Sequence, residues 1–390
     1  MIFGRHSVLK RGCSTWDPAQ VPQAEFQARL DVVREEMARR DLDALVIYGD
    51  NYSFADLCYL TNYFPKVRGG IAAVPREGAI SLLLNIGSRD VPFAKTLTWV
   101  EDVRASNQVG ADGAKLLKEK GFEKAKIGLI DSGLGFPLPQ LEEMKGALPN
   151  VSWQACDAMI VPQRLVKTAR ELGAMREAGR LLHEICNEAE KFIKPGRKEY
   201  EMIADIDRLA RDKGAEDIRI LAGERRLNPP SFKQSATLGS HWAVYLAVQH
   251  ERYWAEAGRT FILSADTKLQ DAYGKAQEIV AQMAKQLKPG GTVAAIEVDA
   301  RLALGEFYAT ASIYGLANGI GLNQWEAPFL NEDDARQVGA ASVGATVLNE
   351  NMTLALRVIF ETEGKIVLFG DSFQVTATGA KSLLSGRIRD

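Results

Sequence analysis

The sequence predicts an α+β protein of two domains, an α/β domain over residues 1–157 and a repeated α+β domain over residues 158–390. In the first part, short apolar segments alternate with amphipathic helical segments, which is typical of an α/β layer. In the second part, a helix, a Lys-Pro-Gly stop, another helix and β-rich segments follow one another twice. The two stops lie at residues 194–196 and 288–290.

Composition limits the classes of protein that remain. The chain has 390 residues, 46% of them hydrophobic and 25% charged, and a formal net charge of −2. Because no basic run occurs, we expect no nucleic-acid partner. No apolar stretch reaches the roughly 18–20 residues that span a bilayer, so we expect no membrane segment. Residues 1–11 are too polar for a signal peptide, and the four cysteines are scattered, which together favour a cytoplasmic location with reduced thiols.

The first domain is expected to begin with an irregular segment up to about residue 22. An amphipathic helix over 25–40 and a buried strand over 42–50 follow, and a further helix is expected over 110–120. Further strands are predicted at the segments YLTNYF, GIAAVP, AISLLLN and KIGLIDSG. The segment IVPQRLVKT is the expected connection to the second domain.

The second domain is organised around a hairpin. Apolar residues 244–248 and β-rich residues 253–261 predict two strands joined by a polar turn at 249–252. Helical periodicity and Pro-Gly stops predict four helices around this hairpin, at 168–193, 200–213, 267–287 and 293–307.

Several motifs resemble those of the pita-bread superfamily, which includes creatinase, Xaa-Pro aminopeptidases and methionine aminopeptidases. The hairpin carries the pair Arg259-Thr260, and later segments read Asn-Gly-Ile-Gly-Leu at 318–322, Glu-Ala-Pro at 326–328 and Val-Thr-Ala-Thr-Gly at 375–379. The resemblance covers residues 160–390 and implies the duplicated α+β fold of that family. The domain that precedes it is similar to those of the creatinase and prolidase branch.

Metallopeptidases of this family hold two metal ions with two aspartates, a histidine and two glutamates. The matching positions are Tyr245, Glu256, Asn318, Arg357 and Gly370, the last beside Asp371. Arginine has no free lone pair, and one carboxylate cannot balance two divalent cations. We therefore expect no metal and no other cofactor.

The substituted positions still suit a small polar substrate. Arg357 can hold a carboxylate through two parallel hydrogen bonds, and Glu256 can act as a general base. Tyr245 and Asn318 are candidate donors to a developing oxyanion. The alternative is that Glu256 and Arg357 form a salt bridge that merely fills a vacated cavity.

Further candidates come from the flanking segments. His241 precedes the hairpin strand, and Glu326 follows Trp325, so both are candidate catalytic groups. Creatinase has its catalytic histidine upstream of the hairpin, in a segment where this sequence has no histidine and offers Arg225, Arg226, Asn228 and Ser231. Arg226 and Asp371 are candidate substrate contacts. In creatinase-like dimers a Phe and an Arg of the first domain reach the neighbouring subunit's site. Here Phe64 matches the Phe, and Lys66 stands at the Arg position. The resemblance therefore implies a homodimer.

These observations lead to three hypotheses. The first is a metal-independent, creatinase-like enzyme that hydrolyses a carbon–nitrogen bond of a small nitrogenous substrate, with a lyase reaction as a variant. The second is a non-catalytic protein that binds a peptide or a partner protein in its cleft, which a cleft filled by Trp242, Trp254 and Trp325 would favour. The third is a metal-dependent Xaa-Pro peptidase.

Overall fold

The computed structural model divides the chain into two compact units, Met1–Arg164 and Leu165–Asp390. It describes residues 15–65, 68–130, 135–230, 237–312, 316–329 and 346–384. The predicted α+β class with two domains is confirmed. The division falls within a short helix, α6 (Val161–Leu165), on the C-terminal side of the predicted boundary at 157. Among the described residues, no helix is both long and apolar enough to cross a membrane.

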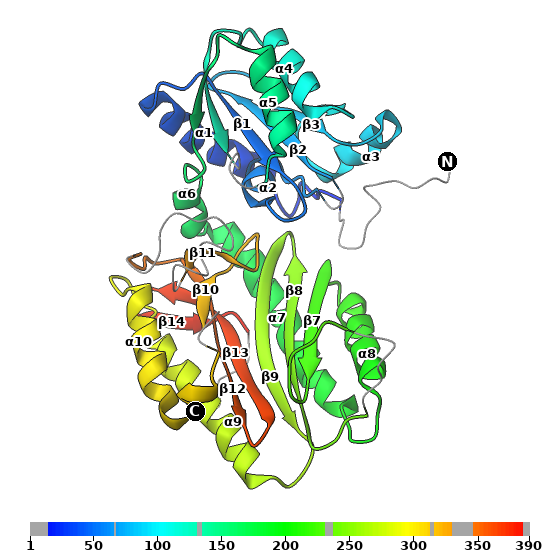
Figure 1. Ribbon diagram of the computed structural model, residues 1–390, viewed down its shortest axis with the longest axis vertical. Coiled ribbons are helices and arrows are strands. Elements are labelled where there is room, and N and C mark those ends of the chain that lie inside the picture. Colours follow the sequence, from blue (N-terminus) through cyan, green and yellow to red (C-terminus); the bar gives the residue numbers. More distant parts are fainter. Residues whose placement is uncertain are drawn as a thin grey trace. The chain divides into compact units, whose positions relative to one another are not determined.

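The first unit is a mixed sheet with helices on its faces (Figure 1). The strand order is β4-β3-β2-β1-β5-β6, with parallel pairing of β1 with β5, β5 with β6 and β3 with β4. Its elements are α1 (Gln23–Arg39), β1 (Ala44–Gly49), α2 (Ala55–Thr61), β2 (Gly70–Pro75), β3 (Ser81–Leu84), α3 (Val91–Ala94), β4 (Asp102–Ala105), α4 (Val109–Glu119), β5 (Lys126–Ile130), α5 (Leu138–Ala147) and β6 (Ser152–Ala155). Short 3₁₀ turns at Ser88–Asp90 and Lys95–Leu97 flank α3.

One strand prediction in this unit is wrong. The segment YLTNYF, predicted as a strand, contains the end of α2, which stops at Thr61. Asn62 follows with a φ of 60°, a left-handed conformation that ends a helix. Every residue of α2 is buried, so its apolar run has no amphipathic period that distinguishes a helix from a strand.

The second unit is an eight-stranded sheet with helices against one face (Figure 1). The strand order is β11-β10-β12-β13-β9-β8-β7, and β14 pairs with β13. Its elements are α7 (Ala169–Phe192), α8 (Glu199–Asp212), β7 (Asp217–Gly223), β8 (His241–His250), β9 (Tyr253–Ile262), α9 (Thr267–Ala284), α10 (Val293–Leu304), a 3₁₀ turn (Gly305–Thr310), β10 (Ala317–Gly319), β11 (Glu326–Phe329), β12 (Thr353–Thr362), β13 (Lys365–Thr376) and β14 (Gly379–Ser382). The predicted helices and the hairpin of this domain are all present.

The Lys-Pro-Gly stops end the helical runs for a physical reason. Gly196 and Gly290 have φ values of 82° and 83°, which glycine adopts without a Cβ clash. At the other end of α7, the Thr168 side chain accepts a hydrogen bond from the backbone N–H of Glu171, and the Glu171 side chain accepts one from the backbone N–H of Thr168. This capping box fixes where α7 begins.

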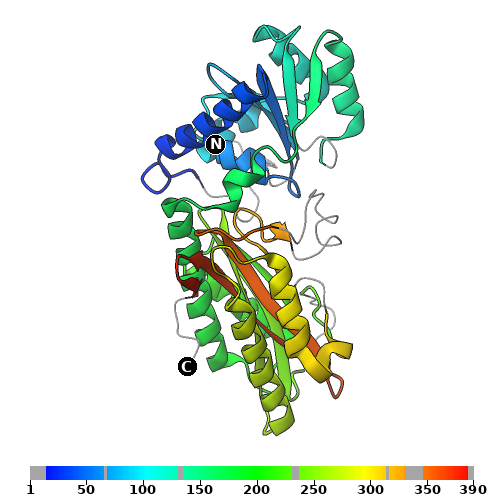
Figure 2. The same cartoon turned by 90° about the vertical axis from the view of Figure 1, so that its left-hand side faces the viewer.

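The helices cover only one face of the sheet. In Figure 2, α9 and α10 lie side by side against the C-terminal strands, with which they form one apolar core. The helices α7 and α8 form a second core with β7, β8 and β9. Successive side chains of a strand point to opposite faces, so alternate residues of the strands project away from the helices. We call that side of the sheet the open face.

The two halves of the sheet meet where β9 pairs with β13, in register at Gly258 and Gly370. A Cβ at Gly258 would lie 2.6 Å from Cγ of Leu368, so the close approach requires glycine. On the helix side, the Arg259 guanidinium donates to the Gly258 and Gly370 carbonyl oxygens at 2.8 and 2.7 Å. Arg259 therefore ties the two halves together from below.

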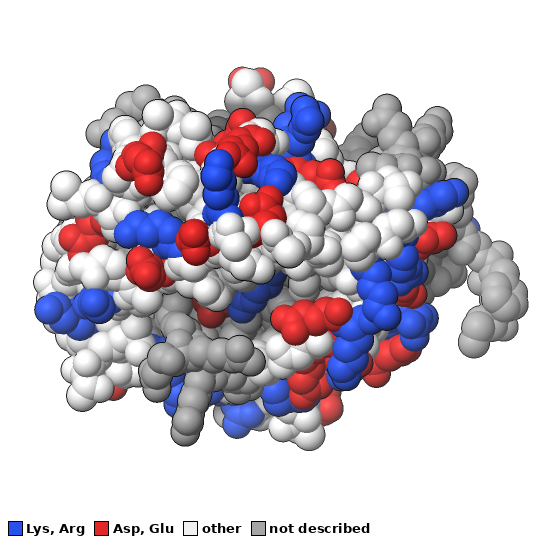
Figure 3. All heavy atoms as spheres, turned by 90° about the horizontal axis from the view of Figure 1, so that it is seen from below, with Lys and Arg blue, Asp and Glu red and all other residues white. Residues whose placement is uncertain are grey.

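Surface charge is mixed on the side of the molecule that Figure 3 shows. Acidic and basic side chains are interspersed there over much of the visible surface. This distribution agrees with the near-neutral formal charge of −2 and gives no broad single-sign field on that side.

Candidate functional site

The strand register brings the four strand-borne candidates to the open face. Tyr245 on β8 is paired with Gly258 on β9, and Arg357 on β12 is paired with Gly370 on β13. Because Gly258 and Gly370 are themselves paired, one row runs across the sheet in the order Tyr245, Gly258, Gly370, Arg357. Paired residues of antiparallel strands share a face, so Tyr245 and Arg357 project from the same side, with two glycines between them.

Glu256 lies between these two side chains and contacts both. Its Oε2 accepts a hydrogen bond of 2.7 Å from the Tyr245 hydroxyl, and its Oε1 forms an ion pair with Nη1 of Arg357. The Glu256 side chain is 4% exposed and that of Arg357 13%. The carboxylate is thus buried between a phenol and a guanidinium, each of which donates to it.

Asn318 and Gln324 complete the network. Nη2 of Arg357 donates to Oδ1 of Asn318 at 2.7 Å, and Nδ2 of Asn318 donates to the Gln324 carbonyl oxygen at 2.8 Å. The Gln324 side chain donates in turn to the Tyr245 hydroxyl at 3.2 Å. The contacts therefore form a closed ring through Tyr245, Glu256, Arg357, Asn318 and Gln324, which we call the polar ring.

The polar ring limits what Asn318 can do. Its two amide hydrogens donate to the carbonyl oxygens of Gly319 and Gln324, and its oxygen accepts from Arg357. An amide has only two donor hydrogens, so none remains for an oxyanion in this arrangement. Asn318 instead positions Arg357 and fixes the turn that carries Gln324.

Tyr245 is held as a neutral donor. Burial and the adjacent Glu256 carboxylate raise the pKa of the Tyr245 hydroxyl well above its usual value, although Arg357 acts in the opposite direction. The phenol therefore keeps its proton at neutral pH and donates it in the hydrogen bond to Glu256.

Trp325 and Ser372 support the network from two sides. The Arg357 guanidinium lies 5.0 Å from the centroid of the Trp325 ring, a cation–π arrangement. The Ser372 hydroxyl accepts from the Glu256 backbone N–H at 2.9 Å and donates to its carbonyl oxygen at 3.0 Å. Gly370 leaves the space for Arg357, since a Cβ there would lie 2.6 Å from the Arg357 Cβ.

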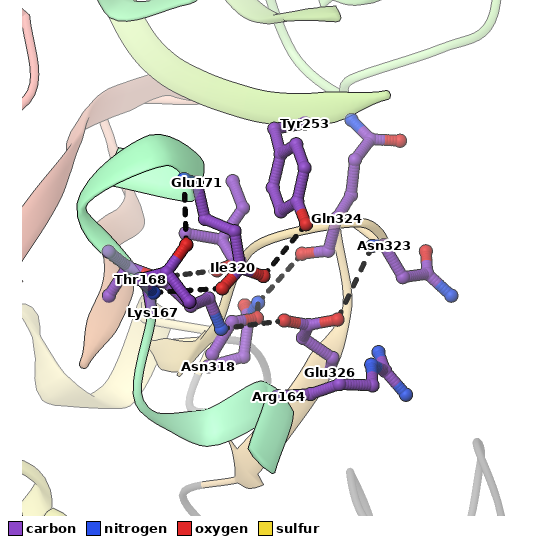
Figure 4. A network of polar contacts seen from close by, with 12 residues as sticks. Arg164, Lys167, Thr168, Glu171, Tyr253, Asn318, Ile320, Asn323, Gln324 and Glu326 are labelled. Carbon is purple, nitrogen blue, oxygen red and sulfur yellow. Dashed lines mark hydrogen bonds and ion pairs between the residues drawn. The ribbon is translucent and has the colours of Figure 1, made fainter. Parts of the chain in front are cut away.

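The turn that carries Gln324 and Trp325 is held by a buried ion pair (Figure 4). Nζ of Lys167 lies 3.0 Å from Oε1 of Glu326, with side-chain exposures of 2% and 8%. Oε2 of Glu326 accepts from the backbone N–H of Asn323 at 3.4 Å. These contacts give Glu326 a positioning role for the 320–326 turn.

A second part of the Figure 4 network joins the hairpin to α7. The Tyr253 hydroxyl donates to Oε1 of Glu171 at 2.7 Å, and Glu171 also belongs to the capping box of α7. The start of β9 is thereby fixed against the helix that underlies the sheet.

His241 and Arg226 lie away from the polar ring. His241 is at the first position of β8, about 13 Å along the strand from Tyr245 at roughly 3.3 Å per residue. Its Nε2 is hydrogen-bonded to the Glu224 carbonyl oxygen at 2.8 Å, and burial lowers the pKa of its imidazole. Arg226 is exposed and donates to Oδ1 of Asn228 at 3.0 Å. Neither side chain contacts Glu256 or Arg357, so the structure brings neither into the ring.

Asp371 lies on the other face of the sheet. Its neighbour Gly370 occupies the open-face row, and alternation turns Asp371 toward the helices. There its Oδ1 accepts from Nη2 of Arg259 at 2.7 Å. Asp371 thus belongs to the support beneath the site, and the open-face position has no side chain.

The two first-domain candidates stay predictions. Phe64 is buried and its ring lies 4.0 Å from that of Phe54, centroid to centroid. Lys66 lies outside the described residues. The expected homodimer, in which both residues would reach the neighbouring subunit's site, likewise remains a prediction.

The donor set does not suit the two-metal site that the family resemblance implies. Its carboxylate, Glu256, is already paired with the Arg357 guanidinium, and Tyr245 is held protonated. Among the described residues, no group of three or more His, Cys, Asp or Glu side chains could hold a metal ion. We therefore derive no reaction step through a metal.

Sequence reasoning missed several residues of the site. Gln324, Ser372 and Lys167 each hold a functional group in place but carry no motif of their own. Gln324 and Trp325 follow the Asn-Gly-Ile-Gly-Leu segment after one intervening residue, Asn323, and this nearness is a signal that points to the turn. Nothing in the sequence identifies Lys167 as the partner of Glu326, because the two are far apart in the chain.

Comparison with protein families gives two matches. Residues 173–377 match the family described as "Metallopeptidase family M24", and residues 29–166 match the one described as "Creatinase/Prolidase N-terminal domain". An Xaa-Pro dipeptidase of Pyrococcus horikoshii is 25% identical over 280 residues, which cover 69% of this chain and 77% of that protein. An uncharacterized hydrolase/peptidase of Sinorhizobium fredii is 28% identical over 213 residues, 48% of this chain. The chain matches only half, 50%, of the length of that relative.

Solved structures share the fold at low sequence identity. The prolidase of Pyrococcus horikoshii has a TM-score of 0.75 at 20% identity and covers 93% of this chain and 99% of that one. An X-Pro aminopeptidase of Thermotoga maritima has a TM-score of 0.77 at 19% identity and covers 92% and 98%. With the family match extending over more than half of its length, this chain belongs to metallopeptidase family M24 and carries the creatinase/prolidase type of N-terminal domain.

Proposed function

We propose that this chain hydrolyses an amide-type carbon–nitrogen bond in a small, peptide-like compound. Membership of family M24 supports a hydrolase of the peptidase type, as does the similarity to an Xaa-Pro dipeptidase. The open face of the sheet supports it as well, because a carboxylate, a phenol and a guanidinium meet there.

We further propose that the centre works without a metal ion. The observation that carries this is the ion pair of Glu256 with Arg357, formed by two positions that match metal ligands of the family. The guanidinium is a fixed cation that belongs to the protein itself. A cation held in a buried site stabilises the negative charge that develops in the transition state, as a metal ion does in metallopeptidases.

The polar ring keeps enough unused hydrogen-bond donors and acceptors for hydrolysis. Each oxygen of Glu256 accepts one hydrogen bond and keeps a lone pair, so the carboxylate can take a proton from a water molecule. Arg357 uses two of its five N–H donors in the ring, and the others can donate to the carbonyl oxygen of the substrate. The water oxygen bonds to the carbonyl carbon, the carbon–nitrogen bond breaks, and Glu256 passes the proton to the leaving nitrogen.

A second candidate is a metal-dependent Xaa-Pro peptidase. The named relatives favour it, because the Pyrococcus horikoshii relative is an Xaa-Pro dipeptidase and the family is one of metallopeptidases. The donor set of the described residues is the argument against it.

A third candidate is a protein that only binds. The closed polar ring and the Trp325 ring over Arg357 favour it, since a ligand must compete with contacts that are already made. Of the other tryptophans, Trp242 is committed elsewhere, with its Nε1 donating to Glu199 at 2.9 Å.

The experiment combines metal analysis with turnover. The purified protein is analysed for transition metals and then assayed by mass spectrometry against Xaa-Pro dipeptides and N-acyl amino acids, with and without chelator. We expect substoichiometric metal and turnover that the chelator leaves unchanged. Two equivalents of metal with chelator-sensitive turnover would establish the second candidate instead.

Variants separate catalysis from binding. Glu256→Gln should abolish turnover while the substrate still binds. Glu297→Gln, which alters a half-buried ion pair with Arg301 within α10, is the matched control. Turnover of normal rate in Glu256→Gln would overturn the assignment of the base. Binding without turnover in the unaltered protein would leave the third candidate.

A further inference from the structure

A second guanidinium lies on the open face beside the polar ring. Arg219 on β7 is paired with Ala247 on β8, which is paired in turn with Glu256 on β9. Paired residues of antiparallel strands share a face, so Arg219 projects from the same side as Glu256. Ala247 lies between them, and its methyl group is too short to fill the space between the two longer side chains.

Arg219 differs from Arg357 in its partners. Arg357 is neutralised by Glu256, whereas no carboxylate forms an ion pair with Arg219 within the described ranges. Asp217, two residues earlier on the same strand, pairs with Arg211 at 3.5 Å. The charges of Glu256 and Arg357 cancel, so among the described residues of these strands the positive charge of Arg219 is left without a counter-charge.

Trp254 holds the Arg219 guanidinium in place. The guanidinium lies 4.9 Å from the centroid of the Trp254 ring, and this indole is fully buried. The Trp254 backbone N–H donates to the Gly321 carbonyl oxygen at 2.9 Å, so the ring is fixed to the turn that carries the site. Stacking of a guanidinium on an aromatic ring leaves its edge N–H groups free to bind a planar anion.

The tryptophans that stack on Arg219 and on Arg357 each carry a donor without an acceptor. The indole nitrogens of Trp254 and Trp325 are buried and have no hydrogen-bond partner among the residues that the structure describes. A buried N–H group without an acceptor is costly, and a ligand that brings acceptor oxygens removes that cost. The field of Arg219 also reaches the ring, where it lowers the pKa of the Tyr245 hydroxyl against the larger effect of burial.

We propose that Arg219 binds the carboxylate of the substrate and thereby restricts the chain to small acids. The inference rests on the proposed function for the reacting bond, which Glu256 would address. Arg219 and Glu256 are two strand spacings apart, or about 10 Å at the backbone. A dipeptide spans about 7 Å when extended, and the two long side chains supply the remaining reach. An acid of dipeptide length therefore fits between them.

The test compares acids with their carboxamides. Binding is measured by calorimetry with Gly-Pro and benzoyl-glycine, each against its carboxamide, in the unaltered protein and in Arg219→Gln. We expect the unaltered protein to bind the acid about 10- to 100-fold more tightly than the amide, as a charge-assisted hydrogen-bond pair implies. In Arg219→Gln the affinity for the acid should fall to the affinity for the amide, and the affinity for the amide should stay unchanged.

Two further variants make the result specific. Arg219→Lys keeps the charge but not the two-pronged donor geometry, so it should retain part of the preference. Arg208→Gln removes an exposed arginine from α8 and is the control for a general loss of positive charge. Both variants should fold, since each changes a side chain that faces solvent.

Every outcome decides for or against the proposal. Preference for acids that persists in Arg219→Gln would overturn it, and so would failure of all these acids to bind at millimolar concentration. Because the titrations measure binding, their result does not depend on turnover. Acid preference lost in Arg219→Gln without any hydrolysis would uphold the carboxylate site and reject the proposed reaction.

Discussion

Replacing Arg357 by methionine tests whether the ion pair at the centre of the site is a single coupled unit. The substitution keeps an unbranched side chain of similar length but removes the charge and the donors to Glu256 and Asn318. Glu256, whose side chain is 4% exposed, would be left with only Tyr245 as a donor. Breaking a buried pair in this way costs about 3–5 kcal/mol, most of it from the carboxylate left without its cation.

A double variant separates this effect from lost packing. In Arg357→Met combined with Glu256→Gln, no charge remains in the ring, so much of the penalty disappears. We expect the double variant to be more stable than the sum of the two single effects predicts, by about 2–3 kcal/mol. This coupling energy measures the pair itself, because packing losses of the single variants add without coupling.

The assay must report on the unit that carries the site. Urea unfolding followed by hydrogen exchange and mass spectrometry gives local free energies, and peptides from β8 and β12 report this sheet. Additivity of the single variants within about 0.5 kcal/mol would refute the reasoning. It would mean that water or another group already compensates Glu256 when Arg357 is absent.

Three further predictions concern single residues. Gly258→Ala should destabilise the second unit by about 1–3 kcal/mol, because the new Cβ would meet Leu368. Gly274→Ala, in an uncrowded position of α9, should stabilise it by roughly 0.5–1 kcal/mol. Thermal unfolding of both variants checks these two values. Burial lowers the pKa of His241 below its usual 6.5, so the unfolded chain takes up a proton first as the pH falls, and stability is lost from about pH 6.5 downward until the lower folded-state pKa is reached. His241→Gln should flatten that slope in unfolding experiments between pH 5 and 8, and an unchanged slope would contradict the assignment. Burial raises the pKa of the Cys186 thiol to about 11, so iodoacetamide at pH 8 should leave Cys186 unmodified in the folded protein and alkylate it only after denaturation.

The fold was accessible from the sequence because its signals are local. The helices α7, α8 and α9 have clear amphipathic periods and Pro-Gly or Gly stops, so their positions follow from the residues themselves. The α2 segment failed because every one of its residues is buried, which removes the period on which such a prediction depends.

The site was accessible only in part. Motif positions identified Tyr245, Glu256, Asn318 and Arg357, and the structure brings all four into contact. What those residues do depends on partners distant in the chain, and no local pattern shows that the hydrogens of Asn318 are already used. Arg219 escaped notice for the same reason, since its relation to Glu256 exists only through the register of three strands.

The seam between β9 and β13 has a consequence for assembly. The two halves of the sheet meet in a pair of glycines, and the contact of Glu256 with Arg357 crosses that line. Each repeat therefore carries only part of the chemistry: a carboxylate and a phenol on one side, a guanidinium and an amide on the other. Two fragments separated in the connection between β9 and α9 would each be inert, and recovery of ligand binding on mixing them would show that the two halves had associated.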